Sequence, residues 1–361
     1  MTEKEELRQQ IDALDRELVT LLNRRLTLAQ GIGRIKNREG QRTLDFQREE
    51  GVLANLMRLN PGPLSQQALK NIFREIISAA RQIQSPLSVA FLGPEATFSH
   101  LATLKKFGSS TRFGPLLSIH EVFTEVEKGN YDYGVVPIEN STEGVVNDTL
   151  DHFAETGLKI CGEIFLEVSH DLVSKSGQRQ DIEVIYSHPQ AYGQCRRWLA
   201  GHLPEVPNIE VASTGIAAQK AAKNPNAAAI ASAAAASLYD LRVVERRIED
   251  HPGNVTHFFV IGPESPGPTG RDKTSIIFAV DNIPGALYKT LQPLAERGLN
   301  MTRIVSRPAK NEAWRYLFFL DLDGHQEDAQ VREALAEIEA LSAHFHLLGS
   351  FPRAGGVENP S

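Results

Sequence analysis

An apolar ladder near the N-terminus constrains the fold more than any other feature of this 361-residue chain. Its apolar residues recur at alternating steps of four and three, which is the spacing of one face of a long α-helix. The members are Leu7, Ile11, Leu14, Leu18, Leu21, Leu28, Ile32 and Ile35. Arg25 interrupts the ladder between Leu21 and Leu28. Because an unpaired charge in an apolar seam is costly, this arginine needs compensation.

The spacing predicts three helices between residues 4 and 84. The first continues to Lys36, and at about 1.5 Å per residue it is roughly 45 Å long. A small bundle cannot cover that length, so we expect the seam to continue against a second copy of the chain. A polar break, REGQRTLD, precedes the second helix, and Ser65 is the expected N-cap of the third.

A second cation is predicted on the same helix face as Arg25. Lys36 follows eleven residues later, about three turns, so both cations face the same way. Asp45, Arg48 and Glu49 cluster at the start of the second helix, and Gln84 ends the third. A pocket of this composition suits a small dianion that carries a hydroxyl group. The alternative is that Arg25 reaches the surface or forms a local salt bridge.

The segment LRQQIDALDRELVTLLNRR, followed by Lys36 and DFQRE, resembles the all-helical chorismate mutases. The resemblance implies that Arg25, together with Arg8 of another protomer, holds the two carboxylates of chorismate. It also implies that Lys36 and Gln84 face the ether oxygen.

By the same resemblance, Asp45 and Glu49 engage the region of the ring hydroxyl, and Arg48 braces them. Ala80 occupies a position where several relatives carry serine, so we expect one lost carboxylate contact and weaker affinity. A Claisen rearrangement needs no nucleophile, so a held conformation and donors aimed at the ether oxygen suffice.

From residue 86 onward, short apolar runs alternate with helical stretches, which is typical of an α/β domain. Five polar segments follow or close these runs: GPEATFSH, PIENSTEG, SHPQAYGQC, STGIAAQ and NVTHFF. Ligands of open α/β sheets bind at strand ends, so these segments are candidate site loops. Each could also serve only to cap a helix.

Together the five segments resemble prephenate dehydratase, which implies two α/β lobes and an essential threonine, here Thr256. The family's TRF motif is Thr256-His257-Phe258 in this chain, so histidine replaces arginine. If His257 approaches the substrate, activity becomes pH-dependent near neutrality; if it points away, the change is neutral.

Threonine is a weak acid, so it must act through a hydrogen bond that strengthens as the hydroxyl leaves. The candidate substrate contacts are Asn140, Ser141, Ser213, Thr214 and Phe258. His170 and His188 are expected to support the site without contacting substrate.

Residues 262–272, GPESPGPTGRD, read as a linker. The eighty residues after it show the order βαββαβ of a ferredoxin-like unit. They resemble ACT domains of phenylalanine-regulated enzymes, with Gly285-Ala286-Leu287 as the GAL motif. Ser306-Arg307-Pro308 matches the end of the ESRP motif, but Val305 replaces its glutamate, which puts the usual regulation in doubt. The alternative is a dimerisation element without ligand.

The rest of the sequence narrows the classes of function. A net charge of −7 argues against a general nucleic-acid binder. The first ten residues, MTEKEELRQQ, contain no apolar h-region, and no run of eighteen apolar residues occurs in the sequence, so we expect a cytoplasmic protein. Cys161 and Cys195 lack ligand spacing, and GxGxxG and GxxxxGK[ST] are absent. We therefore expect no metal and no cofactor.

The predicted architecture is an all-α mutase domain at 1–86, a two-lobed α/β dehydratase domain at 87–263, an α+β ACT domain at 273–351 and a disordered tail at 352–361. This order resembles the bifunctional chorismate mutase/prephenate dehydratases. It implies conversion of chorismate to prephenate and then to phenylpyruvate, feedback by L-phenylalanine, and a homodimer or higher oligomer. The alternatives are a ligand sensor with a helical dimerisation segment, and an arogenate dehydratase.

Overall fold

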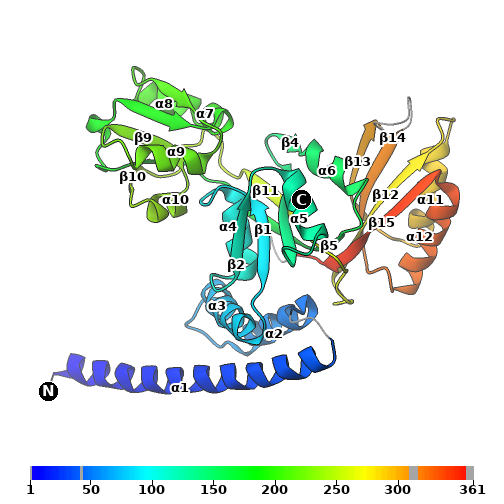
Figure 1. Ribbon diagram of the computed structural model, residues 1–361, viewed down its shortest axis with the longest axis horizontal. Helices are drawn as coiled ribbons and strands as arrows, with labels where there is room; N and C mark the ends of the chain where they lie inside the picture. The colour runs from blue at the N-terminus through cyan, green and yellow to red at the C-terminus, as the bar shows by residue number, and fades with distance from the viewer. Residues whose placement is uncertain (1, 41–43, 309–315, 355–361) are drawn as a thin grey trace. The chain divides into compact units, whose positions relative to one another are not determined.

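The computed structural model describes residues 2–40, 44–308 and 316–354, and the chain divides into two compact units (Figure 1). The helical unit contains Met1–Ser88 and Lys106–Arg112. The α/β unit contains Val89–Lys105 and Phe113–Ser361. In the described part of the chain, no helix combines the length and the apolar character needed to cross a bilayer.

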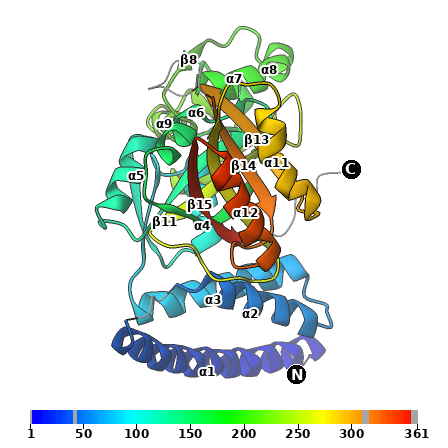
Figure 2. The same cartoon turned by 90° about the vertical axis from the view of Figure 1, so that its right-hand side faces the viewer.

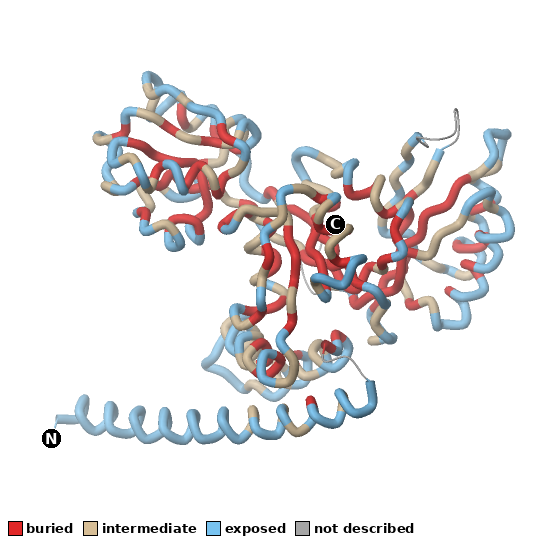
Figure 3. Tube along the Cα trace, viewed as in Figure 1, coloured by how far each residue is buried: buried red, intermediate tan, exposed pale blue. Residues whose placement is uncertain are grey.

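The helical unit has the three predicted helices, α1 (Glu3–Arg38), α2 (Phe46–Leu59) and α3 (Gln66–Gln84). A capping box formed by Thr2 and Glu5 starts α1, and Ser65 caps α3 as expected. The apolar ladder of α1 is uncovered within one chain, as the pale-blue helix in Figure 3 shows. Leu14, for example, is 58% exposed.

The first lobe of the α/β unit is built on a sheet of order β2-β1-β3-β11-β5, with β4 paired to β3. Its strands are β1 (Ser88–Leu92), β2 (Arg112–Leu116), β3 (Tyr133–Asn140), β4 (Gly144–Val145), β5 (Lys159–Glu167) and β11 (Val255–Gly262). Its helices are α4 (Phe98–Phe107), α5 (Ile119–Glu127) and α6 (Asn147–Phe153). β11 is the last strand of this sheet in chain order, and it inserts antiparallel between β3 and β5.

The second lobe has a sheet of order β10-β6-β9-β7-β8. Its strands are β6 (Asp171–Ser174), β7 (Val184–Ser187), β8 (Asn208–Glu210), β9 (Ala227–Ala231) and β10 (Arg242–Glu245). Its helices are α7 (Pro189–Gln194), α8 (Arg196–His202), α9 (Thr214–Ala221) and α10 (Ala233–Leu238), with a 3₁₀ turn at Arg179–Asp181. The Ala-rich stretch is helix, buried strand and helix, because small side chains let α9 and α10 pack closely on β9.

The third sheet has the order β13-β14-β12-β15 and confirms the predicted βαββαβ unit. Its elements are β12 (Asp272–Val280), α11 (Ala286–Glu296), β13 (Met301–Pro308), β14 (Tyr316–Asp323), α12 (Ala329–Leu341) and β15 (His344–Pro352). Figure 2 shows α11 and α12 on one side of this sheet, where they cover a core that includes Phe278 and Leu320.

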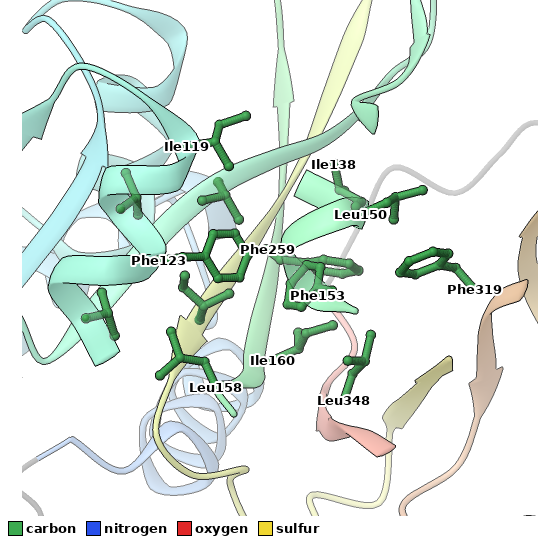
Figure 4. Close-up of a cluster of buried hydrophobic side chains, with 14 of the residues drawn as sticks. Ile119, Phe123, Ile138, Leu150, Phe153, Leu158, Ile160, Phe259, Phe319 and Leu348 are labelled. Atoms are coloured by element: carbon green, nitrogen blue, oxygen red, sulfur yellow. The ribbon is translucent and has the colours of Figure 1, made fainter. Parts of the chain in front are cut away.

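The opposite face of the third sheet packs on the first lobe. Phe319 and Leu348 of the third sheet join Phe153, Ile160 and Phe259 of the first lobe in one buried cluster (Figure 4). The ordered chain also extends further than predicted. Pro352 ends β15, and residues 353 and 354 are described, so the predicted disordered tail begins too early. Residues 355–361 lie outside the described chain.

Candidate active sites

The helical unit brings Gln84 against α1. A Cβ atom on Gly33 would lie 2.8 Å from Cβ of Gln84, so the two helices approach closely enough to require glycine. Lys36 lies one turn beyond Gly33 and is half-buried. The end of α3 therefore reaches the segment of α1 that carries this lysine.

Arg25 is half-buried, and its Nη1 atom is buried without a hydrogen-bond partner among the described residues. A buried guanidinium N–H without an acceptor is costly, so this atom is suited to a bound anion. Arg8 lies seventeen residues earlier on the same helix, a distance of about 25 Å, and is exposed. One chain therefore cannot direct both arginines at one small molecule.

The cluster at the start of α2 differs from the prediction. Asp45 caps the helix, since its Oδ1 accepts from the backbone amide of Arg48 at 2.8 Å. Glu49 pairs with Arg81 at 3.3 Å, and the side chain of Arg48 is exposed. Burial raises the pKa of Glu49, and Arg81 opposes that shift. Glu49 therefore enters the site as a partner of Arg81, a residue that the sequence analysis did not single out.

In the α/β unit, Asn140 at the end of β3 pairs directly with Thr256 at the start of β11. The side chain of Asn140 donates from Nδ2 to Oγ1 of Thr256 at 2.8 Å and to Oδ1 of Asn254 at 2.7 Å. Two residues far apart in sequence thus meet because β11 inserts beside β3. Both had been predicted as site residues.

The orientation of the Asn140 amide is fixed by the backbone. Its Oδ1 accepts from the amides of Thr142 and Glu143 at 3.0 and 3.1 Å. The opposite end must therefore be the NH₂ group, which can only donate. Thr256 Oγ1 accepts that bond, and its own hydroxyl proton remains available for a ligand.

Three further residues extend this network. Asn254 donates to Oε1 of Gln194 at 3.1 Å, and the same oxygen contacts Nε2 of His170 at 2.9 Å. His170 therefore donates from Nε2, and burial lowers its pKa, which favours the neutral ring. Asn254 and Gln194 lie inside the NVTHFF and SHPQAYGQC segments, but nothing in the sequence indicated which polar residues there face each other.

Ser141 and the two second-lobe candidates occupy different places. Ser141 Oγ accepts from the amide of Val255 at 2.9 Å and lies 3.3 Å from Asn254 Oδ1. Ser213 caps α9 by accepting from the amide of Ile216 at 3.1 Å. Ser213 therefore serves as a helix cap.

Thr214 is buried at the start of α9, next to Gly215. A Cβ atom on Gly215 would lie 2.5 Å from the carbonyl oxygen of Glu95 in the GPEATFSH loop. Two of the five polar segments therefore touch each other. His188, the residue before α7, makes no capping hydrogen bond through its side chain.

The other two members of the TRF-like motif, His257 and Phe258, are both buried. Phe258 is only 1% exposed and belongs to the core, so it packs instead of contacting a substrate as predicted. His257 pairs with Glu139 in the sheet, stacks on Phe165 and places Nε2 3.1 Å from Glu163. The structure thus supports the reading in which His257 points away.

The motifs of the third sheet occupy two places. Gly285-Ala286-Leu287 starts α11, where Gly285 has a positive φ of 80°. Arg307 pairs with Asp151 of α6 at 3.0 Å, whereas Ser306 and Pro308 are exposed. Val305 packs on the cluster shared with the first lobe, which explains an apolar residue at the position of the glutamate in the ESRP motif.

Comparisons with known proteins agree with this division. Family models match residues 7–85 as chorismate mutase type II, 89–266 as prephenate dehydratase and 274–340 as the ACT domain. The bifunctional chorismate mutase/prephenate dehydratase of Aquifex aeolicus is 45% identical over 98% of this chain and 99% of its own length.

Two solved structures resemble the α/β part. The prephenate dehydratase of Arthrobacter aurescens in complex with L-Phe has a TM-score of 0.68 and 34% identity, and the match covers 74% of this chain and 90% of that one. A protein described as a quorum quenching acylase has a TM-score of 0.68 and 31% identity, with 74% and 98% covered.

Proposed function

The chain belongs to the family of bifunctional chorismate mutase/prephenate dehydratases, and we propose that its helical unit converts chorismate to prephenate and its α/β unit converts prephenate to phenylpyruvate. The two reactions need different contributions from the protein. The first needs a held conformation and charge stabilisation, whereas the second needs a proton donor at a leaving hydroxyl.

In the mutase site, Arg25 supplies a buried donor for a carboxylate of chorismate. Lys36 and Gln84 supply an ammonium and an amide for the ether oxygen, on which negative charge grows as the C–O bond breaks. The close contact at Gly33 holds Gln84 beside this part of α1. Arg81 fixes Glu49 near the same end of α3, where it can meet the ring hydroxyl.

We further propose that a second copy of the chain completes this site with its Arg8. The exposed ladder on α1 and the distance between Arg8 and Arg25 along the helix support this. The test mixes Arg8→Ala and Arg25→Ala chains after co-refolding. Each variant alone is expected to lose mutase turnover, and the mixture should recover about a quarter of it, since half the dimers are mixed and each has one intact site. If the mixture stays inactive, Arg8 does not act across chains.

The single observation that carries the dehydratase assignment is the polarity of Thr256. Because Asn140 must donate to Thr256, this bond does not use the hydroxyl proton of the threonine, which is available to a ligand. That proton can bond to the ring hydroxyl of prephenate and strengthen its departure as carbon dioxide is lost and the ring becomes aromatic. Ser141 and Thr214 remain candidate contacts for the substrate carboxylates.

The activity test incubates the purified chain with chorismate and follows chorismate loss and phenylpyruvate absorbance together. Both signals are expected, with prephenate appearing between them. Arogenate supplied in place of prephenate distinguishes the two dehydratase substrates, and faster turnover of arogenate would overturn the choice made here. Binding of prephenate without turnover would favour a ligand sensor.

We also propose feedback by L-phenylalanine through the third sheet and α11. The helix dipole at the N-terminus of α11 favours a bound carboxylate, and Arg307 connects β13 to α6 of the first lobe. Titration of phenylalanine against the dehydratase rate should give a saturable decrease. A flat response up to millimolar concentrations would reduce this sheet to a structural role.

A further inference from the structure

A cavity of about 800 Å³ lies inside the α/β unit, between the first-lobe sheet and the third sheet. Its walls carry four basic side chains, Arg271, Lys273, Arg303 and Arg353. Pockets of this volume hold small metabolites. Asn140 and Thr256 do not line it, so the cavity is separate from the dehydratase pair described above.

The two most deeply buried acids of the cavity are already neutralised. Glu163 accepts from Lys273 Nζ and from the amide of Ala354, both at 2.9 Å. Asp321 accepts from Nε of Arg303 at 2.9 Å and from the hydroxyl of Ser275. These carboxylates therefore have little capacity left to satisfy further donors.

Donors remain unsatisfied in the same cavity. Nη1 of Arg303 is buried and has no hydrogen-bond partner among the described residues. The guanidinium of Arg271 forms no ion pair within the described part of the chain, whereas Arg353 pairs with Asp323 at 3.3 Å. Glu139 is the remaining acid of the wall. The excess donors suit one oxyanion, because guanidinium groups bind carboxylate and phosphate in two-point geometry.

We propose that this cavity binds a small organic acid through one carboxylate or phosphate group held by Arg271 and Arg303. Phe165 and Met301 line the same cavity and offer apolar contact to the rest of the ligand. Glu139 can accept from a hydroxyl or ammonium group of that ligand. The site is distinct from the GAL-like segment at the start of α11, none of which lines the cavity.

The cavity is coupled to Thr256 through the alternation of strand side chains. Glu139 and His257 form one cross-strand pair and line the cavity, and the next pair, Asn140 and Thr256, faces the other side. A ligand that displaces the backbone of the first pair therefore also displaces the adjoining backbone of the second. Ser141 also borders the cavity while it bonds to the Asn254 network.

Calorimetric titration of the full-length protein at constant ionic strength tests binding directly. Inorganic phosphate and acetate serve as separate probes, and the tighter one identifies the preferred group. Arg271→Gln should weaken one binding event at least tenfold. Arg303→Lys keeps the charge opposite Asp321 but removes Nη1, so it should act likewise. Arg332→Gln, an equal charge change on the exposed face of α12, is the matched control.

Equal binding by the wild type and both cavity variants would overturn the proposal, and so would equal loss in the control. Because the probes can also enter the two active sites, dehydratase turnover at saturating prephenate provides a second measurement. The better probe should change kcat in the wild type and in Arg332→Gln but not in Arg271→Gln. A response that persists in Arg271→Gln would place the effect elsewhere and overturn the coupling. The calorimetric result does not depend on the proposed activities.

Discussion

The two candidate active sites are built in opposite ways. On α1, the apolar ladder is exposed and Arg25 keeps an unsatisfied buried donor. Around Thr256, by contrast, the side chains of Asn140, Asn254 and Gln194 already satisfy one another within one chain. The comparison teaches that a long helix with an exposed apolar face depends on a partner to cover that face, as proposed above for the mutase site, whereas a mixed sheet can assemble a polar network within one chain by inserting β11 between two earlier strands.

The sharpest separation of the two sites is expected from Thr256→Ala. Without the hydroxyl, the leaving group has no donor, and dehydratase kcat should fall about 100-fold to 10,000-fold. Mutase turnover of the same protein should not change. Thr256→Ser restores the hydroxyl and is the control. An alanine variant that still forms phenylpyruvate at the wild-type rate would remove Thr256 from the mechanism.

The association side of the comparison is tested by Leu14→Glu. A carboxylate in the apolar ladder costs several kcal/mol if that ladder is buried between chains, so mutase activity should fall at least tenfold in dilute protein. Dehydratase activity should remain. Ala13→Glu places the same charge next to the ladder, at an exposed position outside it, and should leave mutase activity unchanged. Sedimentation measurements of both variants report whether chain association changed.

The self-contained site is tested by Asn254→Ala, a smaller change. Removing the amide takes one hydrogen bond from Asn140 and one from Gln194, and an unmade buried hydrogen bond costs about 1–3 kcal/mol. Dehydratase kcat should fall about 10-fold to 100-fold. Asn254→Asp keeps the acceptor for Asn140 but cannot donate to Gln194, so it should lie between the alanine variant and the wild type. Equal kcat for all three would show that the network is only structural.

The smallest effect concerns acid stability of the α/β unit. Burial alone would raise the pKa of Glu163, but His257, Lys273 and the amide of Ala354 outweigh it and hold this pKa at about 2. Burial lowers the pKa of His257 from 6.5, against the opposing pull of Glu163. Both groups take up protons more readily in the unfolded chain.

Stability from these groups is therefore present at neutral pH. The His257 contribution is lost as pH falls below 6.5, and that of Glu163 as pH falls from 4.5 towards 2. His257→Gln should flatten the upper part of a plot of melting temperature against pH, and Glu163→Gln the lower part. A wild-type melting temperature that does not decline across this range would contradict the assignment. The same variants should leave the mutase rate unchanged at pH 7.

The three helices, the βαββαβ unit and the order of the three domains could be predicted from the sequence, because each follows from local periodicity or a quoted motif. The sequence placed Thr256 and Asn140 among the site residues for the same reason. It did not reveal Asn254, Gln194 or Arg81, since these roles depend on which side chains face one another after β11 enters the sheet and α3 packs.

Phe258 is a residue that the motif match proposed as a substrate contact but that the structure places in the core. Its place in a motif suggested contact with substrate, but its side chain is only 1% exposed on a strand that pairs with β3 on one edge and β5 on the other, so it is a core residue. Asp45 and Ser213, which the sequence analysis proposed as substrate contacts, also cap helices. A motif match does not show which side chains are used for packing or for capping a helix, because those uses depend on the local backbone.

β11 is held along its whole length by ladders to β3 on one edge and β5 on the other. The position of Thr256 near the start of β11 is therefore set by the strand pairing inside the lobe and not by the surrounding loops. If Thr256 is the proton donor as proposed, substitutions in those loops can change which ring acid is accepted without moving the donor.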